Sequence, residues 1–178
     1  MEKQRTLLFV TNSELGQAGV ILAVAYEFLV RREYDVHIAS FPALQSSIDH
    51  LNDTAFRLSN GTCSAITFHH LSGKSMKEAA PPGTEFLDLH PPGIKGALFA
   101  YDNVLPATFA PWHGVEYMIG YSSTIEIINH VAPRLVVVDP LFSQAAIGQK
   151  CMILSPNTFK ELVLDRQPSG GALWKFPA

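Results

Sequence analysis

Cysteine is scarce in this sequence of 178 residues, which contains only Cys63 and Cys151. Two cysteines are too few for the disulfide framework of a small secreted domain, and their separation does not match a zinc ribbon. The pair therefore predicts free thiols, behaving mainly as small buried hydrophobic side chains, in a protein of a reducing compartment.

Charge excess and long hydrophobic runs are also missing. The net charge is −3 and 16% of the residues are charged, so no polyelectrolyte attraction to nucleic acid or to an anionic membrane is expected. The longest apolar stretch, Gly19 to Val30, contains Glu27 and is shorter than the roughly 20 residues of a spanning helix. The apolar stretch Leu7 to Val10 is too short for a signal peptide. These absences predict a cytoplasmic protein with no nucleic-acid partner and no membrane span.

Two common nucleotide-binding patterns are incomplete. Gly16 and Gly19 supply half of the three-glycine dinucleotide fingerprint, which makes a Rossmann oxidoreductase of the NAD type a poor alternative. Gly73-Lys-Ser75 lacks the upstream glycine of a phosphate-binding P-loop. His69 and His70 are adjacent on a predicted strand and point to opposite faces, and His37 stands alone on another strand, so no metal site is predicted.

Short apolar strands alternate with amphipathic helices along the chain. The strands are expected at residues 6–11, 35–40, 65–70, 135–139 and 152–155. The helices are expected at residues 19–32, 42–51 and 114–131, the last one stopped by Pro133. The buried stripe of the first helix is expected at Val20, Ala23, Val24, Phe28 and Leu29, and that of the third at Tyr117, Tyr121, Ile125 and Ile128. The alternation predicts an α/β fold with a Rossmann-like, doubly wound parallel sheet.

The length suits one domain over residues 1–178. Residues 71–96 contain Pro81-Pro82-Gly83 and Pro91-Pro92-Gly93, so this stretch is expected to be an extended excursion with little regular structure. The chain then ends soon after Trp174 and Phe176, aromatic residues that normally pack on a surface, and it is therefore expected to be cut short.

Ligands of an open doubly wound sheet bind at the carboxyl ends of its strands, where the strand order reverses. The turn from Asn12 to Gly19 and the strand end at Asp139 are predicted to meet there. Asp139 follows four apolar residues, and a carboxylate in that position is costly unless it caps a helix, binds a proton donor or takes part in chemistry. A helix cap for the residues after Leu141 is the alternative to a functional role.

Six sequence words, in this order along nearly the whole chain, carry a resemblance to fungal UDP-glycosyltransferases. They are Thr11-Asn-Ser-Glu-Leu-Gly-Gln17, Asp35-Val-His-Ile-Ala-Ser40, Ala110-Pro-Trp112, Val136-Val-Val-Asp-Pro-Leu-Phe-Ser-Gln144, Ile153-Leu-Ser-Pro-Asn-Thr158 and Gly170-Gly-Ala-Leu-Trp174. The chain resembles only the amino-terminal, acceptor-binding half of such a GT-B enzyme. The resemblance implies that the carboxyl-terminal, donor-binding domain is absent.

The resemblance implies an inverting sugar transfer from a UDP-sugar to an acceptor hydroxyl. In the family, a histidine in the turn after the first strand deprotonates the acceptor, and an aspartate after the fourth strand orients that histidine. Asp139 matches the aspartate, whereas Gln17 occupies the histidine position and cannot take up a proton. Glu14, in the same turn, is the candidate substitute base.

The acceptor pocket is expected to be formed by the turn of residues 14–19 with Gln17, by Asp139 to Phe142, and by the aromatic segment from Phe109 to Trp112. Apolar and aromatic walls with few polar groups suit a small lipophilic or phenolic alcohol, such as a fungal secondary metabolite. No metal or covalently bound cofactor is implied, and a UDP-sugar co-substrate is expected only with a donor domain.

The alternative to an enzyme is a non-catalytic acceptor-binding or regulatory module, or one half of a two-chain transferase that pairs with a donor-domain partner. Gln17 and the missing donor half favour this alternative. An apolar surface that normally faces the donor half is also expected to favour self-association.

Overall fold

A computed structural model describes residues 5–81, 93–104, 110–146 and 151–154 of the chain. The chain divides into two compact units, residues 1–75 with 113–156 and residues 76–112 with 157–178. The single-domain prediction covers the whole chain and stays a prediction.

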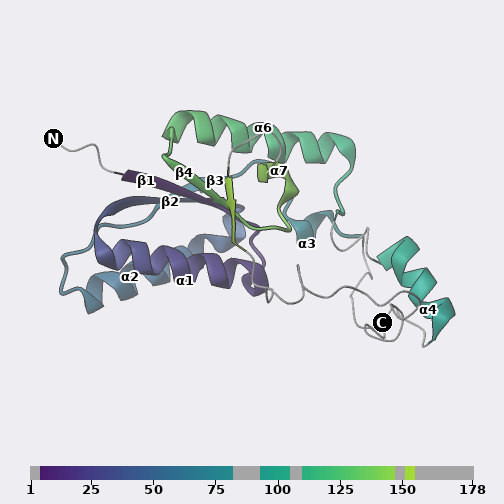
Figure 1. Ribbon diagram of the computed structural model, residues 1–178, viewed down its shortest axis with the longest axis horizontal. Coiled ribbons are helices and arrows are strands. Elements are labelled where there is room, and N and C mark those ends of the chain that lie inside the picture. Colours follow the sequence, from purple (N-terminus) through teal and green to yellow (C-terminus); the bar gives the residue numbers. More distant parts are fainter. Residues whose placement is uncertain (1–4, 82–92, 105–109, 147–150, 155–178) are drawn as a thin grey trace. The chain divides into compact units, whose positions relative to one another are not determined.

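The first unit is built on a five-stranded parallel sheet with the order β3-β2-β1-β4-β5. Its strands are β1 (Arg5–Val10), β2 (Tyr34–Ser40), β3 (Thr67–His70), β4 (Leu135–Val138) and β5 (Cys151–Ile153). The strand order reverses between β1 and β4, as predicted for a doubly wound sheet. The fold class predicted from the sequence is therefore confirmed (Figure 1).

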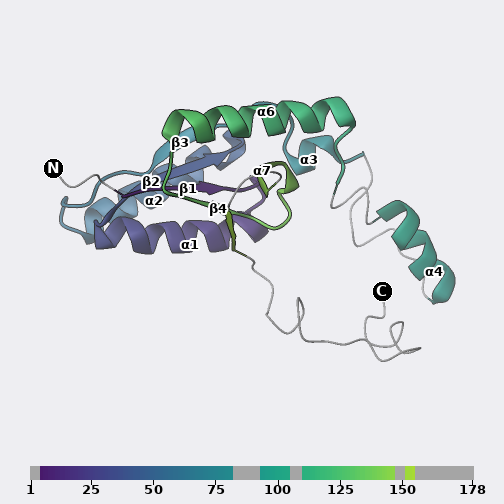
Figure 2. The same ribbon diagram turned by 45° about the horizontal axis from the view of Figure 1, so that its top comes forward.

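Helices cover both faces of this sheet. The long helices are α1 (Leu15–Arg31), α2 (Gln45–Leu58), which follows the 3₁₀ turn Pro42–Leu44, and α6 (Gly114–Val131); α7 (Ser143–Ala146) is a short helix between β4 and β5. Figure 2 shows α6 on one face of the sheet and α1 on the opposite face. The largest core cluster lies on the α1 and α2 side, where Phe9, Val36 and Ile38 are buried against Ile21 and Leu29.

The buried faces of two helices differ from the sequence prediction. Helix α1 buries Ala18, Ile21, Leu22, Ala25 and Leu29. Of the expected stripe, Leu29 is buried, Val24 and Phe28 are partly buried against the core, and Ala23 is exposed. Helix α6 buries Gly120, Ser123, Thr124 and Ile128, so of its expected stripe only Ile128 is fully buried. Both helices are apolar around much of their circumference, and the face is chosen by the sheet on which they pack rather than by their own periodicity.

The bounds of α6 agree with its predicted range. His113 and Glu116 form a reciprocal capping box at its start, and Glu116 also lies 2.6 Å from the Lys74 ammonium. At its end, Ala132 takes a left-handed conformation with φ 45°, and Pro133 prevents a further turn.

The described part of the second unit contains α3 (Met76–Ala79), α4 (Ile94–Phe99) and a π-helical turn at Ala100–Val104. Two helices therefore lie in or begin within the excursion expected at residues 71–96, while residues 82–92 of that excursion lie outside the described residues.

Candidate functional site

Polar residues gather where β1, β2 and β4 end. The register pairs Val10 of β1 with Ala39 of β2 and with Val138 of β4. Thr11 therefore stands between Ser40 and Asp139 at the carboxyl edge of the sheet, and the Thr11 amide donates to the Ala39 carbonyl at 3.2 Å. This is the place at which an open parallel sheet presents residues to a ligand.

Asp139 lies at the centre of this edge and is only 1% exposed. Its Oδ2 accepts a hydrogen bond from Thr11 Oγ1 at 3.1 Å, and its Oδ1 accepts one from the Leu141 amide at 2.9 Å. Burial raises the pKa of this carboxyl, while the hydrogen bonds from Leu141, Thr11 and the Asn12 backbone act in the opposite direction. The carboxylate is thus held rigidly and is more basic than an ordinary aspartate.

The hydrogen bond to Leu141 also answers the helix-cap alternative. It joins the Asp139 side chain to the backbone two residues later and so closes a local turn before α7, which begins at Ser143. Asp139 therefore has a structural role in this turn in addition to its position at the sheet edge.

The turn from β1 into α1 carries two further predicted site residues. Glu14 is the N-cap of α1, and its carbonyl accepts the amides of Gln17 and Ala18, each at 3.0 Å. The Glu14 and Gln17 side chains are both half-buried. The structure therefore brings Glu14 and Gln17 to the same edge of the sheet as Asp139, at the positive end of the α1 dipole.

Several buried polar atoms at this edge have no hydrogen-bond partner within the part of the chain that the structure describes. They are Asn12 Oδ1 and Nδ2, Gln17 Oε1, Ser40 Oγ, and Gln144 Oε1 and Nε2. Buried polar groups are normally paired, and each unpaired one costs about 1–3 kcal/mol. This unused hydrogen-bonding capacity is typical of a place where water or the polar group of a ligand is bound.

Sequence reasoning placed Asn12 in the turn that meets Asp139 but missed Thr11 and Ser40 as members of the site. These two residues meet Asp139 through the lateral register of three strands. The signal that could have identified them was their common position, one or two residues after the apolar part of each strand.

The three aromatic residues predicted for the acceptor pocket lie in different parts of the chain's structure. Phe142 is fully buried and packs edge-on against Phe41, with ring centroids 5.8 Å apart, so it supports the Asp139 turn from the core side. Trp112 is buried and belongs to the second unit. Phe109 lies outside the described residues, and the roles of all three in acceptor binding stay predictions.

Among the described residues, at least two clefts lie on the first unit. One of about 540 Å³ runs between α1 and α2 and begins at Leu15, directly after Glu14. Another, of about 420 Å³, lies between Ser72 and the residues of α6 around Met118 and Ile119. Asp139 lines neither cleft, so the polar edge and these apolar grooves are separate features.

The described residues were also searched for side chains that could bind a metal ion. No group of three or more His, Cys, Asp or Glu side chains among the described residues could hold a metal ion. Cys63 and Cys151 are free thiols, as the sequence predicted, and each is half-buried.

The comparison with known proteins gives the site its context. Over 195 aligned residues the chain is 29% identical to the glycosyltransferase sdnJ of Sordaria araneosa, and the alignment covers 99% of this chain and 36% of sdnJ. The chain is similar to a fungal glycosyltransferase. The resemblance seen in the sequence words is thereby confirmed. No protein-family model matches the chain.

Two glycosyltransferases are among the solved structures that match the chain. CalG4, the calicheamicin glycosyltransferase, matches with a TM-score of 0.50 and 15% identity over 90% of this chain and 36% of CalG4. SnogD of Streptomyces nogalater matches with a TM-score of 0.49 and 17% identity over 86% of this chain and 34% of SnogD. The chain spans about a third of the length of these glycosyltransferases. The likeness to CalG4 concerns the fold alone.

A search of the described helices for a membrane span was negative: none of them combines the length and the hydrophobicity that crossing a bilayer requires.

Proposed function

We propose that this chain is the acceptor-binding half of a glycosyltransferase that moves a sugar from a UDP-sugar to a hydroxyl group of a small acceptor. The observation that carries the proposal is the buried carboxyl group of Asp139, whose pKa is raised and which lies at the switch point of the sheet. The alignment with sdnJ covers 99% of this chain, so it includes this site. Perturbed carboxylates in such a position are candidates for function.

In the proposed reaction the acceptor hydroxyl lies at the turn between β1 and α1. Its oxygen attacks the anomeric carbon of the donor sugar, the bond from that carbon to the diphosphate breaks, and UDP leaves with inversion. The Glu14 carboxylate would accept the hydroxyl proton, because the Gln17 amide cannot. Asp139 would position the turn through Thr11, to which it is hydrogen-bonded.

The proposed acceptor is a lipophilic or phenolic alcohol with at least one hydroxyl group. The lipophilic body is proposed from the family resemblance, since the groove that begins at Leu15 is separate from Asp139. The unpaired Asn12 and Gln17 atoms support recognition of a polar group. Secondary metabolism, a cytoplasmic location and a UDP-sugar bound through a separate donor half belong to the same proposal.

A second candidate function is a non-catalytic acceptor-binding module, alone or as one half of a two-chain transferase. Gln17 favours it, since an amide stands where the resembling family has its proton-accepting histidine. Loss of a positioned general base typically costs about a hundredfold to ten-thousandfold in rate. Under this candidate, Glu14 would not take up the proton.

Calorimetric titration of the 178-residue chain separates these functions. We expect a phenolic acceptor panel to bind with saturation, and UDP and UDP-glucose to bind only when a donor-domain chain is added. With such a chain present, Glu14→Gln should lower turnover by about a hundredfold or more, and Glu33→Gln, at the exposed far end of α1, serves as the matched control. Acceptor binding without turnover, even with a donor-domain chain present, would support the non-catalytic module. Unchanged turnover in Glu14→Gln would show that Glu14 is not the base, and no acceptor binding by a folded chain would overturn both functions.

A further inference from the structure

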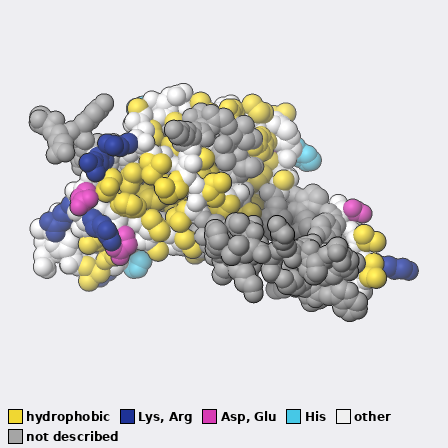
Figure 3. Space-filling model, in the orientation of Figure 1, with side chains coloured by type: hydrophobic (Ala, Val, Ile, Leu, Met, Phe, Trp, Pro, Cys, Tyr) yellow, Lys and Arg dark blue, Asp and Glu magenta, His cyan; other side chains and the backbone are white. Residues whose placement is uncertain are grey.

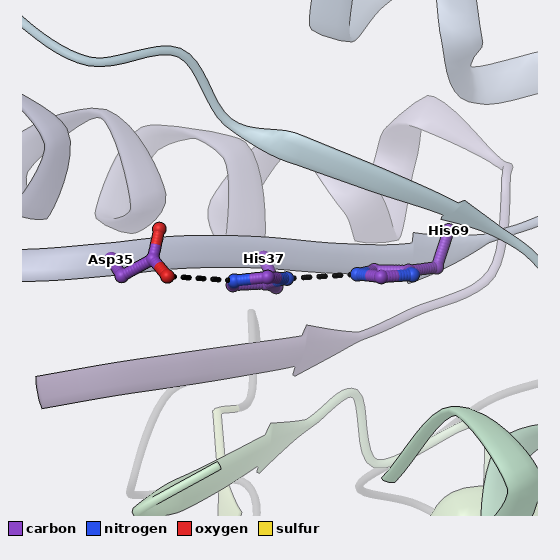
Figure 4. A network of polar contacts seen from close by, with 3 residues as sticks. All are labelled: Asp35, His37 and His69. Atoms are coloured by element: carbon purple, nitrogen blue, oxygen red, sulfur yellow. Dashed lines mark hydrogen bonds and ion pairs between the residues drawn. The ribbon is translucent and has the colours of Figure 1, made fainter. Parts of the chain in front are cut away.

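Three side chains on β2 and β3 form a hydrogen-bonded row that lies apart from the proposed acceptor site. His37 Nε2 lies 3.0 Å from Asp35 Oδ2, and His37 Nδ1 lies 2.8 Å from His69 Nε2. The two imidazole rings are nearly parallel, with centroids 5.1 Å apart and 14° between their planes. Figure 4 shows the three side chains in line, with His37 between Asp35 and His69.

This row faces α6 rather than the main core. Val36 and Ile38 point into the cluster beneath α1 and α2, so the alternate residues Asp35 and His37 point to the other face of the sheet. The register pairs Ala39 with His69, which brings His69 to that same face. His130 of α6 acts on it as well, because the charges of His37 and His130 both lower the pKa of His69, in addition to the larger effect of its burial.

With both rings neutral, the protons of the row can be arranged so that every contact is satisfied. An ionised carboxylate only accepts, so His37 Nε2 carries a proton and donates it to Asp35. His37 Nδ1 then bears a lone pair and accepts from the protonated Nε2 of His69. Both rings are neutral in this arrangement, and the contact of 2.8 Å contains a single proton.

Full protonation disturbs the arrangement. One additional proton is accommodated if it lies on His37 Nδ1 and His69 changes tautomer, because His37 then donates both to Asp35 and to His69 Nε2. A charge on both rings is not accommodated, because it sets one N–H against another across the contact of 2.8 Å. The charge on His69 would also lie in a half-buried position beside His37 and His130. The charged groups that face His69 are thus Asp35 and His37 from β2 and His130 from α6, and Asp35 is the only acid among these three.

The strand that carries His69 lies at the edge of the sheet. Among the described strands, β3 pairs with β2 alone. The residues after it contact the first unit: the Leu71 amide donates to the Ser40 carbonyl at 2.9 Å, the Ser72 amide donates to Ser123 Oγ at 3.0 Å, and Lys74 pairs with Glu116. Residues 71–75 lead to Met76, where the second unit begins.

We propose that Asp35, His37 and His69 form a proton-sensitive latch, which holds edge strand β3 in the sheet at neutral pH and releases it on acidification. Release would loosen the segment of residues 71–75 that follows β3. The proposal does not depend on glycosyl transfer.

The direction of the pH dependence follows from linkage. His69 has a lowered pKa in the folded chain, so the unfolded or opened strand binds its proton more readily. The stability that the latch contributes is therefore present above the ordinary histidine pKa of about 6.5 and is lost as the pH falls below it.

Amide hydrogen exchange resolved by residue tests the latch in the 178-residue chain. Between about pH 7.5 and about pH 5.5, after correction for intrinsic exchange, we expect the protection of the β3 amides to fall at least about tenfold relative to β1 amides. His69→Asn should remove this pH dependence. His70→Asn is the matched control, because His70 is the exposed next residue and contacts Phe68 instead of His37. A fall that is the same in His69→Asn as in the wild type would overturn the proposal.

A second measurement keeps the proposal testable if His69→Asn does not fold. Proton NMR titration of the wild-type histidines should show His69 titrating below the ordinary value and together with the opening of β3. Asp35→Asn removes the only acid of the row and should move the opening to higher pH by roughly one unit. An ordinary titration of His69, or an Asp35→Asn opening at the wild-type pH, would contradict the latch.

Discussion

At the scale of single residues, the carboxyl edge of the sheet contains side chains that lower the stability of the fold. Asp139 is buried, which raises its pKa, and Asn12 is buried with both side-chain amide atoms unpaired among the described residues. A core optimised only for stability would hold apolar side chains of similar shape at both positions. Such residues are a usual sign of a site selected for binding or chemistry.

Replacing Asp139 tests whether its charge is costly. A raised folded-state pKa means that the folded chain loses stability as the pH rises through that pKa. Asp139→Asn keeps an oxygen for the Leu141 amide and removes the charge, so its free energy of unfolding should exceed the wild-type value by on the order of 1 kcal/mol at neutral pH, and by less near pH 4. Urea unfolding at both pH values measures this difference.

Asp139→Ala provides the contrast, since it deletes the acceptor of two hydrogen bonds and should lose about 1–3 kcal/mol. A less stable Asp139→Asn, with a deficit that does not change with pH, would show that burial of the charge is not the cost that we infer.

Asn12 gives a second test of the same idea. Asn12→Leu replaces an unpaired amide by an apolar group of similar shape, and we expect it to raise the free energy of unfolding by about 1 kcal/mol while weakening acceptor binding. Asn52 is the matched control, because both of its amide atoms are paired with Ile66. Asn52→Leu should therefore lose about 1–3 kcal/mol. If chemical unfolding shows that both variants are destabilised equally, the Asn12 side chain is hydrogen-bonded in the folded protein and the inference is wrong.

At the scale of elements, the strands could be predicted from the sequence and the helix faces could not. Each strand is a compact apolar run between polar turns, so β1, β2 and β4 fall within one residue of their predicted bounds. Helix α1 has apolar residues on several sides, and only the sheet selects the face of Ile21 and Leu22. The row of His37 and His69 is a cross-strand contact, and no local pattern fixes the register that creates it.

The crossover from β4 to β5 shows the same limit. Its length is close to the dozen residues that a crossover between parallel strands usually needs. In the structure β5 pairs in parallel with β4, and α7 lies between the two strands in the chain. On the α6 side, Gln144 of α7 packs against Gly120, where a Cβ atom would lie 3.0 Å from the Gln144 amide. The close approach of these two helices therefore depends on the absence of a side chain at residue 120.

A double-mutant cycle tests this contact. Gly120→Ala gains helix propensity but forces the buried Gln144 amide to move, so we expect a net loss of about 1–3 kcal/mol. Gln144→Ala removes that amide, and the double variant should recover most of the loss, giving a coupling energy of about 1 kcal/mol or more in thermal or urea unfolding. Additive effects would mean that the two residues do not constrain each other.

At the scale of the whole molecule, the first unit has an open sheet edge. β5 pairs only with β4 in the described sheet, and its residues Met152 and Ile153 are 54% and 60% exposed. Figure 3 shows hydrophobic side chains gathered on the face where α1 and this edge meet. Exposed apolar edge strands are templates for pairing with another chain.

Self-association through β5 is therefore expected for the 178-residue chain, and Ile153→Lys should suppress it because a lysine on an edge strand opposes strand pairing. Sedimentation velocity over a concentration series, in reducing buffer to keep Cys151 from forming intermolecular disulfides, measures the effect. Leu58→Lys is the matched control, since Leu58 is 70% exposed at the end of α2, away from the sheet edge. If Leu58→Lys reduces association as strongly as Ile153→Lys, added charge rather than the β5 edge governs solubility. A monomeric wild type at every concentration would show that the edge is already protected.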